Sequence, residues 1–155
     1  MDNPYSKSLE ARILAATPLE LVVILYDEAI SAVRAARGHL AAGNIRERSR
    51  SVSKAVNILI ELSRSLNFDA GGELSLRLAG VYGFMRNTLL EANFRQTDDG
   101  LATTEKLLMS LREAWSTVSD QSMSASAARA VASLPAGFPW GTVHDAQPES
   151  RSWSA

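Results

Sequence analysis

The sequence predicts an all-α fold, an antiparallel four-helix bundle with a short N-terminal amphipathic arm and a disordered C-terminal tail. Three observations indicate this fold: apolar residues recur at helical spacing in four segments, short turn sequences separate them, and no segment alternates like a strand. Helices of about 20 residues joined by short turns pack most simply as an antiparallel bundle. We expect the arm at residues 1–16, the bundle at 17–119 and a Ser/Ala- and Pro-rich tail at 120–155.

The arm carries Tyr5, Leu9 and Ile13 at the spacing of a weak amphipathic helix. Such a segment can become helical when something covers its apolar side. Of all segments in the chain, it is the natural candidate to occupy a groove on the bundle.

The first bundle helix is predicted to begin at Thr17-Pro18-Leu19-Glu20, a capping box with proline at the first helical position. It runs to about Ala42, where Gly43 can adopt the left-handed conformation that ends a helix. Its apolar arc spans about 200°, wider than the roughly 100° that one buried face requires. Either both bundle neighbours cover this arc, or part of it, including Leu25 and Tyr26, contacts a partner.

The second helix is predicted from Ile45 to Leu66, because Asn44 and Glu47 form a typical helix start. One side of this helix is apolar. Its residues are Val52, Ala55, Val56, Leu59, Leu62 and Leu66. The helix ends before the turn sequence that leads to Gly71-Gly72.

The third helix, predicted from Gly71 to Phe94, has two apolar sides. The core side consists of Leu74, Leu78, Val81, Met85, Leu89 and Ala92. The opposite side, here called the outer stripe, consists of Leu76, Gly80, Gly83, Leu90 and Phe94. A helix on the outside of a bundle buries only one face, and glycine within a helix costs about 0.5–1 kcal/mol. The outer stripe therefore requires a cover, which is either the N-terminal arm or an external partner.

The fourth helix is predicted from Leu101 to Val118, with Leu108, Leu111 and Trp115 on its inner side. The chain then becomes rich in serine and alanine, and later in proline, without periodicity. Trp140 and Trp153 in this tail are either part of a short binding motif or an extension without a function.

Composition argues against several functional classes. Sixteen basic and seventeen acidic residues give a net charge of -1, so the chain offers no electrostatic basis for nucleic-acid binding. No cysteine is present, and neither histidine lies in a Glu-x-x-His pattern, so we expect no metal, no cofactor and no catalytic residue. The absence of a signal-like N-terminus and of a long apolar run favours a cytoplasmic protein without membrane insertion.

Several collinear motifs carry a resemblance to a known family. They include Ala15 to Leu21 (AATPLEL), Leu25-Tyr26-Asp27, Gly43-Asn44-Ile45, Gly71-Gly72-Glu73-Leu74, Val81-Tyr82, Leu89 to Asn93 and Leu111-Arg112. Together they closely resemble the FliS family of flagellin-specific secretion chaperones, from about Tyr5 to Val118.

The resemblance implies a cytoplasmic, non-enzymatic helical bundle that binds the C-terminal segment of flagellin, prevents its premature polymerisation and delivers it to the flagellar type III export apparatus. It places Leu25, Tyr26, Leu90 and Asn93 along or beside the flagellin path, and makes the arm with Tyr5 a movable cover over the groove. Other flagellar regulators or export-gate components are further partners to consider, and a homodimer stays open. The alternative is a non-enzymatic adaptor that binds another flagellar regulator.

Overall fold

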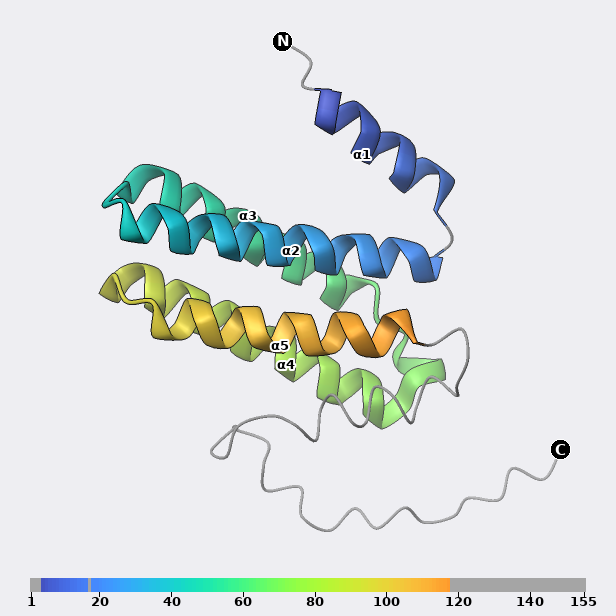
Figure 1. Ribbon diagram of the computed structural model, residues 1–155. Coiled ribbons are helices and arrows are strands. Elements are labelled where there is room, and N and C mark those ends of the chain that lie inside the picture. The colour runs from blue at the N-terminus through green and yellow to red at the C-terminus, as the bar shows by residue number, and fades with distance from the viewer. Residues whose placement is uncertain (1–3, 17, 118–155) are drawn as a thin grey trace, which may run out of the picture.

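The computed structural model describes residues 4–16 and 18–117, and within them it contains helices and no strand. The helices are α1 (Pro4–Ala15), α2 (Pro18–Ala41), α3 (Ile45–Arg64), α4 (Phe68–Arg95) and α5 (Asp99–Ser116). Helices α2 to α5 form an antiparallel four-helix bundle, and α1 projects away from it (Figure 1). The predicted all-α bundle is confirmed. The predicted tail lies outside the described residues.

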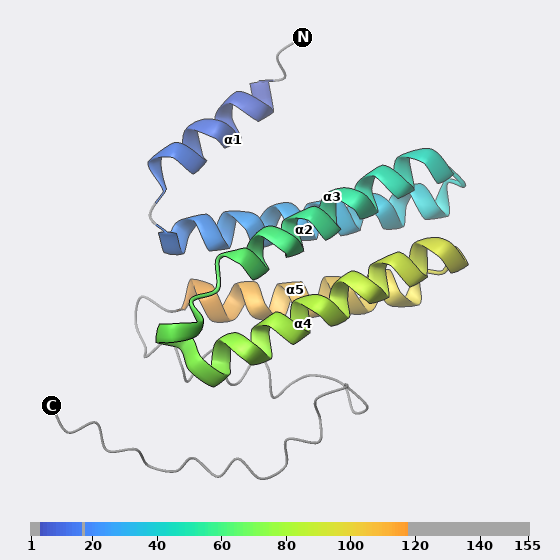
Figure 2. The same cartoon turned by 180° about the vertical axis from the view of Figure 1, so that it is seen from behind.

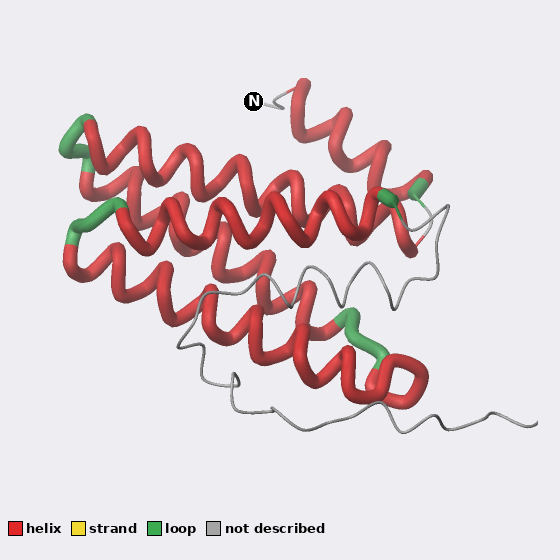
Figure 3. The backbone as a smooth tube through the Cα atoms, turned by 60° about the horizontal axis from the view of Figure 1, so that its bottom comes forward, coloured by secondary structure: helices red, strands yellow, loops and turns green. Residues whose placement is uncertain are grey.

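The helix ends follow from local signals. Gly43 adopts a left-handed φ of 71°, and the Asn44 side chain accepts a hydrogen bond from the Glu47 amide at 3.3 Å. These two residues end α2 and begin α3, as predicted. Helix α2 begins at Pro18, as expected, whereas Thr17 of the predicted capping box lies outside the described residues. Short loops of this kind join the bundle helices (Figure 3).

The beginning of α4 differs from the prediction. The helix begins at Phe68 because the Asn67 side chain accepts a hydrogen bond from the Ala70 amide at 3.0 Å and so caps an additional first turn. Gly72 then interrupts the helical geometry with a φ of 48° and a ψ of -123°. Figure 2 shows the short turn before the long part of α4. The glycine pair therefore marks a kink inside the helix and not its first residue.

The four bundle helices surround one core. Helix α2 packs extensively against α3 and α5, and α4 packs against the same two helices, so α2 and α4 lie diagonally opposite (Figures 1 and 2). The predicted core sides supply most of the buried residues. They include Ala29, Val33, Val52, Leu59, Leu62, Leu78, Val81, Met85, Leu89, Leu101, Leu108 and Leu111. None of the described helices combines the length and the apolarity that a membrane crossing requires.

Candidate partner-binding surface

The outer stripe of α4 lies on the surface. Leu76, Leu90 and Phe94 keep 64%, 52% and 86% of their area exposed, whereas the opposite side of α4 is buried in the core. Among the described helices, α4 makes extensive contacts with α3 and α5 alone. The described part of the chain therefore leaves three large apolar side chains uncovered along one face of one helix.

Gly80 and Gly83 make the middle of the outer stripe flat. Both glycines are partly buried, and a methyl group built on Gly83 would meet only the Arg86 guanidinium, at 3.8 Å. The Arg86 Nε atom is buried, and it has no hydrogen-bond partner among the described residues. The centre of the stripe is thus a shallow position beside an arginine, open to a bulky apolar group.

Asn93, expected on the partner surface, is bound within the bundle. Its side-chain oxygen accepts a hydrogen bond from Arg48 Nε at 2.8 Å, and its main-chain oxygen accepts one from Arg48 Nη2 at 3.3 Å. Ser49 lies within 3.4 Å of the same side chain. Arg48 is only 3% exposed and stabilises the last turn of α4, where carbonyl groups lack helical partners.

Sequence reasoning missed this role of Arg48, which stands between two other arginines, Arg46 and Arg50. The structure separates them, since Arg48 faces α4 while Arg46 and Arg50 are exposed. Its position on the inner side of α3, one turn before Val52, was the available signal.

Tyr26, also expected beside the partner path, lies inside the core. It is 0% exposed, its hydroxyl is hydrogen-bonded to the Tyr82 hydroxyl, and it accepts a hydrogen bond from Trp115 Nε1 at 3.1 Å. Burial raises the pKa of Tyr26 well above its ordinary value and raises the pKa of Tyr82 to about 12, so both hydroxyls are neutral near pH 7. In this conformation Tyr26 does not reach a partner directly. It joins α2, α4 and α5 instead.

Leu25, the neighbour of Tyr26, is half-buried and packs against the core from the side of α2. Because α2 and α4 are diagonal, Leu25 does not belong to the outer stripe of α4. The predicted site residues therefore divide into a surface set on α4 and a supporting set within or beside the core.

The predicted cover residues lie on α1. Tyr5 is 82% exposed and Ile13 37%, whereas Leu9 is partly buried, and no residue of α1 is fully buried. The arm is helical although the bundle does not cover it, which the sequence did not predict. In this position α1 makes no extensive contact with α4. The movable-cover role of Tyr5, Leu9 and Ile13 stays a prediction.

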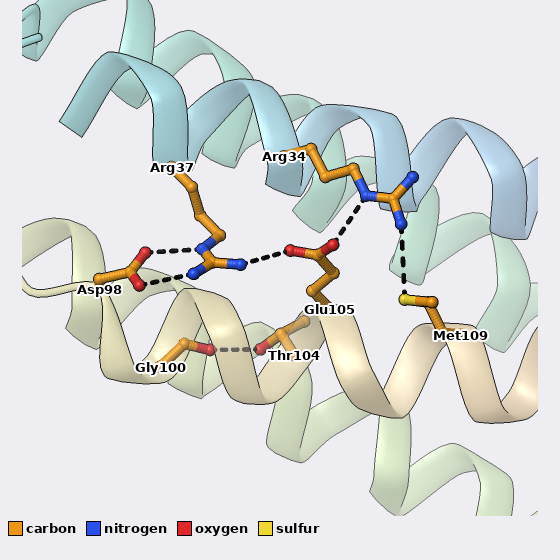
Figure 4. Close-up of polar contacts among 7 residues, drawn as sticks. All are labelled: Arg34, Arg37, Asp98, Gly100, Thr104, Glu105 and Met109. Atoms are coloured by element: carbon orange, nitrogen blue, oxygen red, sulfur yellow. Dashed lines mark hydrogen bonds and ion pairs between the residues drawn. The ribbon is translucent and has the colours of Figure 1, made fainter. Parts of the chain in front are cut away.

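Charged pairs join α2 and α5 along another face of the bundle (Figure 4). Arg37 donates two hydrogen bonds to Asp98, at 2.7 and 2.8 Å, and one to Glu105, at 2.8 Å. Arg34 donates to the other oxygen of Glu105 at 2.7 Å. Hydrogen bonds from Arg37 lower the pKa of Asp98, and those from Arg34 and Arg37 lower the pKa of Glu105.

Asp98 directly precedes α5 and forms no side-chain cap for it, and its carboxylate pairs with Arg37 on the neighbouring helix. Asp27 likewise pairs with Arg112 of α5. The carboxylates and guanidinium groups of these pairs are bound to one another. The outer stripe, in contrast, exposes apolar side chains.

The described residues contain no group of three or more His, Cys, Asp or Glu side chains arranged to hold a metal ion. The most distinctive surface feature of the described residues is the exposed apolar stripe on α4, which lies on a bundle with a well-packed core. Such a stripe suits binding of a polypeptide.

Comparison with known proteins places the chain in a family. The family described as "Flagellar protein FliS" matches residues 1–122. The chain is 34% identical to the flagellar secretion chaperone FliS of Salmonella typhimurium over 113 residues, which cover 72% of this chain and 84% of that protein.

Two further relatives are similar at comparable coverage. The flagellar secretion chaperone FliS of Bacillus subtilis is 30% identical over 115 residues, 74% of this chain and 85% of that protein. The flagellar secretion chaperone FliSB of Pseudomonas aeruginosa is 30% identical over 112 residues, 72% of this chain and 89% of that protein.

Proposed function

Because this chain belongs to the FliS family of flagellar proteins, we propose that it is a cytoplasmic flagellar export chaperone. It binds the disordered C-terminal segment of flagellin, prevents premature polymerisation and delivers the subunit to the flagellar type III export apparatus. It does so by occupying apolar surface, without enzymatic activity.

The observation that carries this proposal is the exposed outer stripe of α4. Leu76 and Phe94 are separated by 18 positions in one helix, so the stripe extends over about 27 Å. A disordered segment with apolar residues at intervals could lie along it and bury each of them. Such an elongated surface suits an extended or helical segment better than a small molecule.

The expected energetics allow both capture and release. Full burial of a Leu or Phe side chain is worth about 1.5–3 kcal/mol, and ordering a disordered segment costs about 2–5 kcal/mol or more. Leu76, Leu90 and Phe94, with the apolar residues that they contact on the partner, can therefore support binding that remains reversible.

The test is a binding measurement between the full chain and a C-terminal fragment of flagellin. We expect a stable one-to-one complex, seen by calorimetry and by size-exclusion chromatography with light scattering. The double variant Leu90→Ser/Phe94→Ser should weaken binding at least tenfold. Failure to form any complex would contradict the chaperone proposal.

A matched control is Ile45→Ser, which removes another exposed apolar side chain, 56% exposed, at the beginning of α3. Because Ile45 lies outside the outer stripe, this variant should bind the fragment as the unmodified chain does. Equal losses in the control and the double variant would indicate general apolar adhesion and not a defined site.

A further inference from the structure

The end of α5 lies beside the beginning of the outer stripe. A methyl group on Gly100, near the start of α5, would lie 3.0 Å from Ala92 Cβ and 3.1 Å from the Thr88 carbonyl oxygen, which sets the register of the two antiparallel helices. Ser116 follows Gly100 by 16 positions, or about 24 Å along the axis. The same distance back along α4 from Ala92 leads to Leu76. Figure 1 shows both helix ends at the same end of the bundle.

The chain continues from this point with residues 118–155, which lie outside the described residues. Most of this segment also lies beyond the family match, which ends at residue 122. Its most apolar aromatic part is the sequence LPAGFPW at 134–140, with Leu134, Phe138 and Trp140. Prolines stand at 135 and 139.

We propose that residues 134–140 bind to the outer stripe of α4 in the same molecule and compete there with the partner segment. This inference rests on the proposed function, because it takes the stripe as the partner-binding surface. The C-terminal segment thereby acts as a tethered cover for the free chaperone and is displaced when flagellin binds.

The path from α5 makes this contact easy to reach. Residues 118–133 number 16, and a flexible chain of that length has a typical end-to-end distance of about 20–25 Å, close to the length of the stripe. A linker that matches its span gives an effective concentration in the millimolar range. Even a weak segment with a dissociation constant near that value would occupy the stripe about half of the time.

The centre of the stripe fits an aromatic side chain. Gly83 leaves open space, and the Arg86 guanidinium borders it. An aromatic ring of Phe138 or Trp140 over Gly83 would lie against this cation, an arrangement in which the cation is attracted to the ring face. It would also cover apolar area that Leu90 now exposes.

Helix α1 is less well placed for the same role. It joins α2 through Ala16 and Thr17 alone, which span about 7 Å, and α2 lies diagonally opposite α4. In the described position α1 makes no extensive contact with α4. The C-terminal segment leaves from α5, a direct neighbour of α4.

The first experiment locates the segment without using flagellin. A spin label is attached to the variant Gly141→Cys of the full chain, which contains no other cysteine. We expect broadening of the amide signals of α4 around Gly80, Gly83 and Leu90. A label at Ala155→Cys should broaden them much less. Broadening confined to α1 or α3, or none, would overturn the proposal.

Mixing isotope-labelled, unmodified chain with spin-labelled, isotope-free chain separates two arrangements. Binding within one molecule predicts no broadening in the mixed sample. Broadening of the same α4 signals there would overturn the proposal in favour of contact between two copies. Because no partner is added, these results stand even if flagellin binding fails.

The second experiment measures competition. The full-length variant Phe138→Ser/Trp140→Ser should bind the flagellin fragment about twofold more tightly, since the tethered competitor that occupies the stripe about half of the time is removed. The control Trp153→Ser, outside the proposed segment, should leave the affinity unchanged. Equal affinity in all three chains would overturn the competition, whereas absence of binding in all three would refute the proposed function instead.

Discussion

Individual residues decide how open the outer stripe is. Gly83 is the clearest case because its missing side chain leaves space on the surface and none in the core. Arg86 borders that space, and Leu90 continues the stripe by two turns. Glycine weakens the helix at this position, and the proposed binding surface gives it a use, because it lets another chain approach the helix closely.

Replacing Gly83 with arginine should weaken binding of the flagellin fragment by tenfold or more, about 1.4 kcal/mol. The long charged side chain would occupy the open space on the stripe without touching the core. Titration calorimetry gives the affinity, and circular dichroism during thermal unfolding reports the fold. Helical content should be unchanged, because arginine favours a helix more than glycine does.

Gly38→Arg is the matched control, since Gly38 lies within α2 with open space around it, away from the outer stripe. This variant should leave the affinity unchanged. Loss of cooperative unfolding in Gly83→Arg alone would mean that the stripe belongs to the folded core and not to a binding surface.

A second residue-scale prediction concerns the buried hydroxyl of Tyr26. Tyr26→Phe removes the partner of both Tyr82 and the Trp115 indole, whereas Tyr82→Phe leaves Tyr26 bonded to Trp115. A buried polar group without a partner costs about 1–3 kcal/mol. Urea unfolding should therefore show a larger loss of stability for Tyr26→Phe. A larger loss for Tyr82→Phe would contradict the central position of the Tyr26 hydroxyl between Tyr82 and Trp115.

Among the elements, α1 and α4 both expose apolar side chains, for different reasons. Helix α4 is held in place because its other side is buried in the core. The outer stripe therefore lies on a helix that is already folded. Helix α1 has 12 residues and none of them is buried, and isolated helices of that length are marginal in water. Binding by α4 therefore needs no ordering of α4, whereas any role of α1 includes its own folding cost.

Deleting residues 1–12 should change the free energy of unfolding by less than about 0.5 kcal/mol, because no described residue of α1 is fully buried. It should also leave affinity for the flagellin fragment undiminished. Urea unfolding and calorimetry test the two parts. A marked loss of affinity would make Tyr5, Leu9 or Ile13 direct partner contacts. Increased binding of an apolar-surface dye after the deletion would support the predicted cover role.

At the scale of the whole molecule, ion pairs join the first and last helices of the bundle. Asp98, directly before α5, and Glu105 of α5 pair with Arg37 and Arg34 of α2, which face them from the neighbouring helix. Their folded-state pKa values are lowered from 3.8 and 4.5. A carboxylate with a lowered folded-state pKa stabilises the fold above its unfolded-state pKa, and this stabilisation is lost as pH falls through the folded-state value.

We therefore expect the bundle to lose stability progressively as the pH falls from about 5 toward the lowered pKa values. Urea unfolding at a series of pH values measures this loss. Glu105→Gln should flatten the profile, because it removes one titrating group, while Glu113→Gln, an exposed residue of α5, should not. An identical profile for Glu105→Gln would contradict a contribution from this ion pair.

The sequence by itself determined the helices, most of their ends and the inner side of each. Those features depend on local chemistry: Asn44 caps its own helix, Gly43 adopts a left-handed φ, and apolar spacing marks a face. The same spacing identified the outer stripe before any fold was known. The extra first turn of α4 was missed because Asn67 was assigned to a break and not to a cap.

Only the tertiary structure decided what the polar and edge residues do. Tyr26 bonds to Tyr82 across 56 positions, Arg48 to Asn93 across 45, and Arg37 to Asp98 across 61. Periodicity assigns a residue to a face of its own helix, but it does not show which helix lies opposite or at what register. That is why the hydrogen bonds of Tyr26 and Asn93 within the bundle were not predicted, and why Leu90 and Phe94, which need no distant partner to be exposed, were recognised from spacing alone.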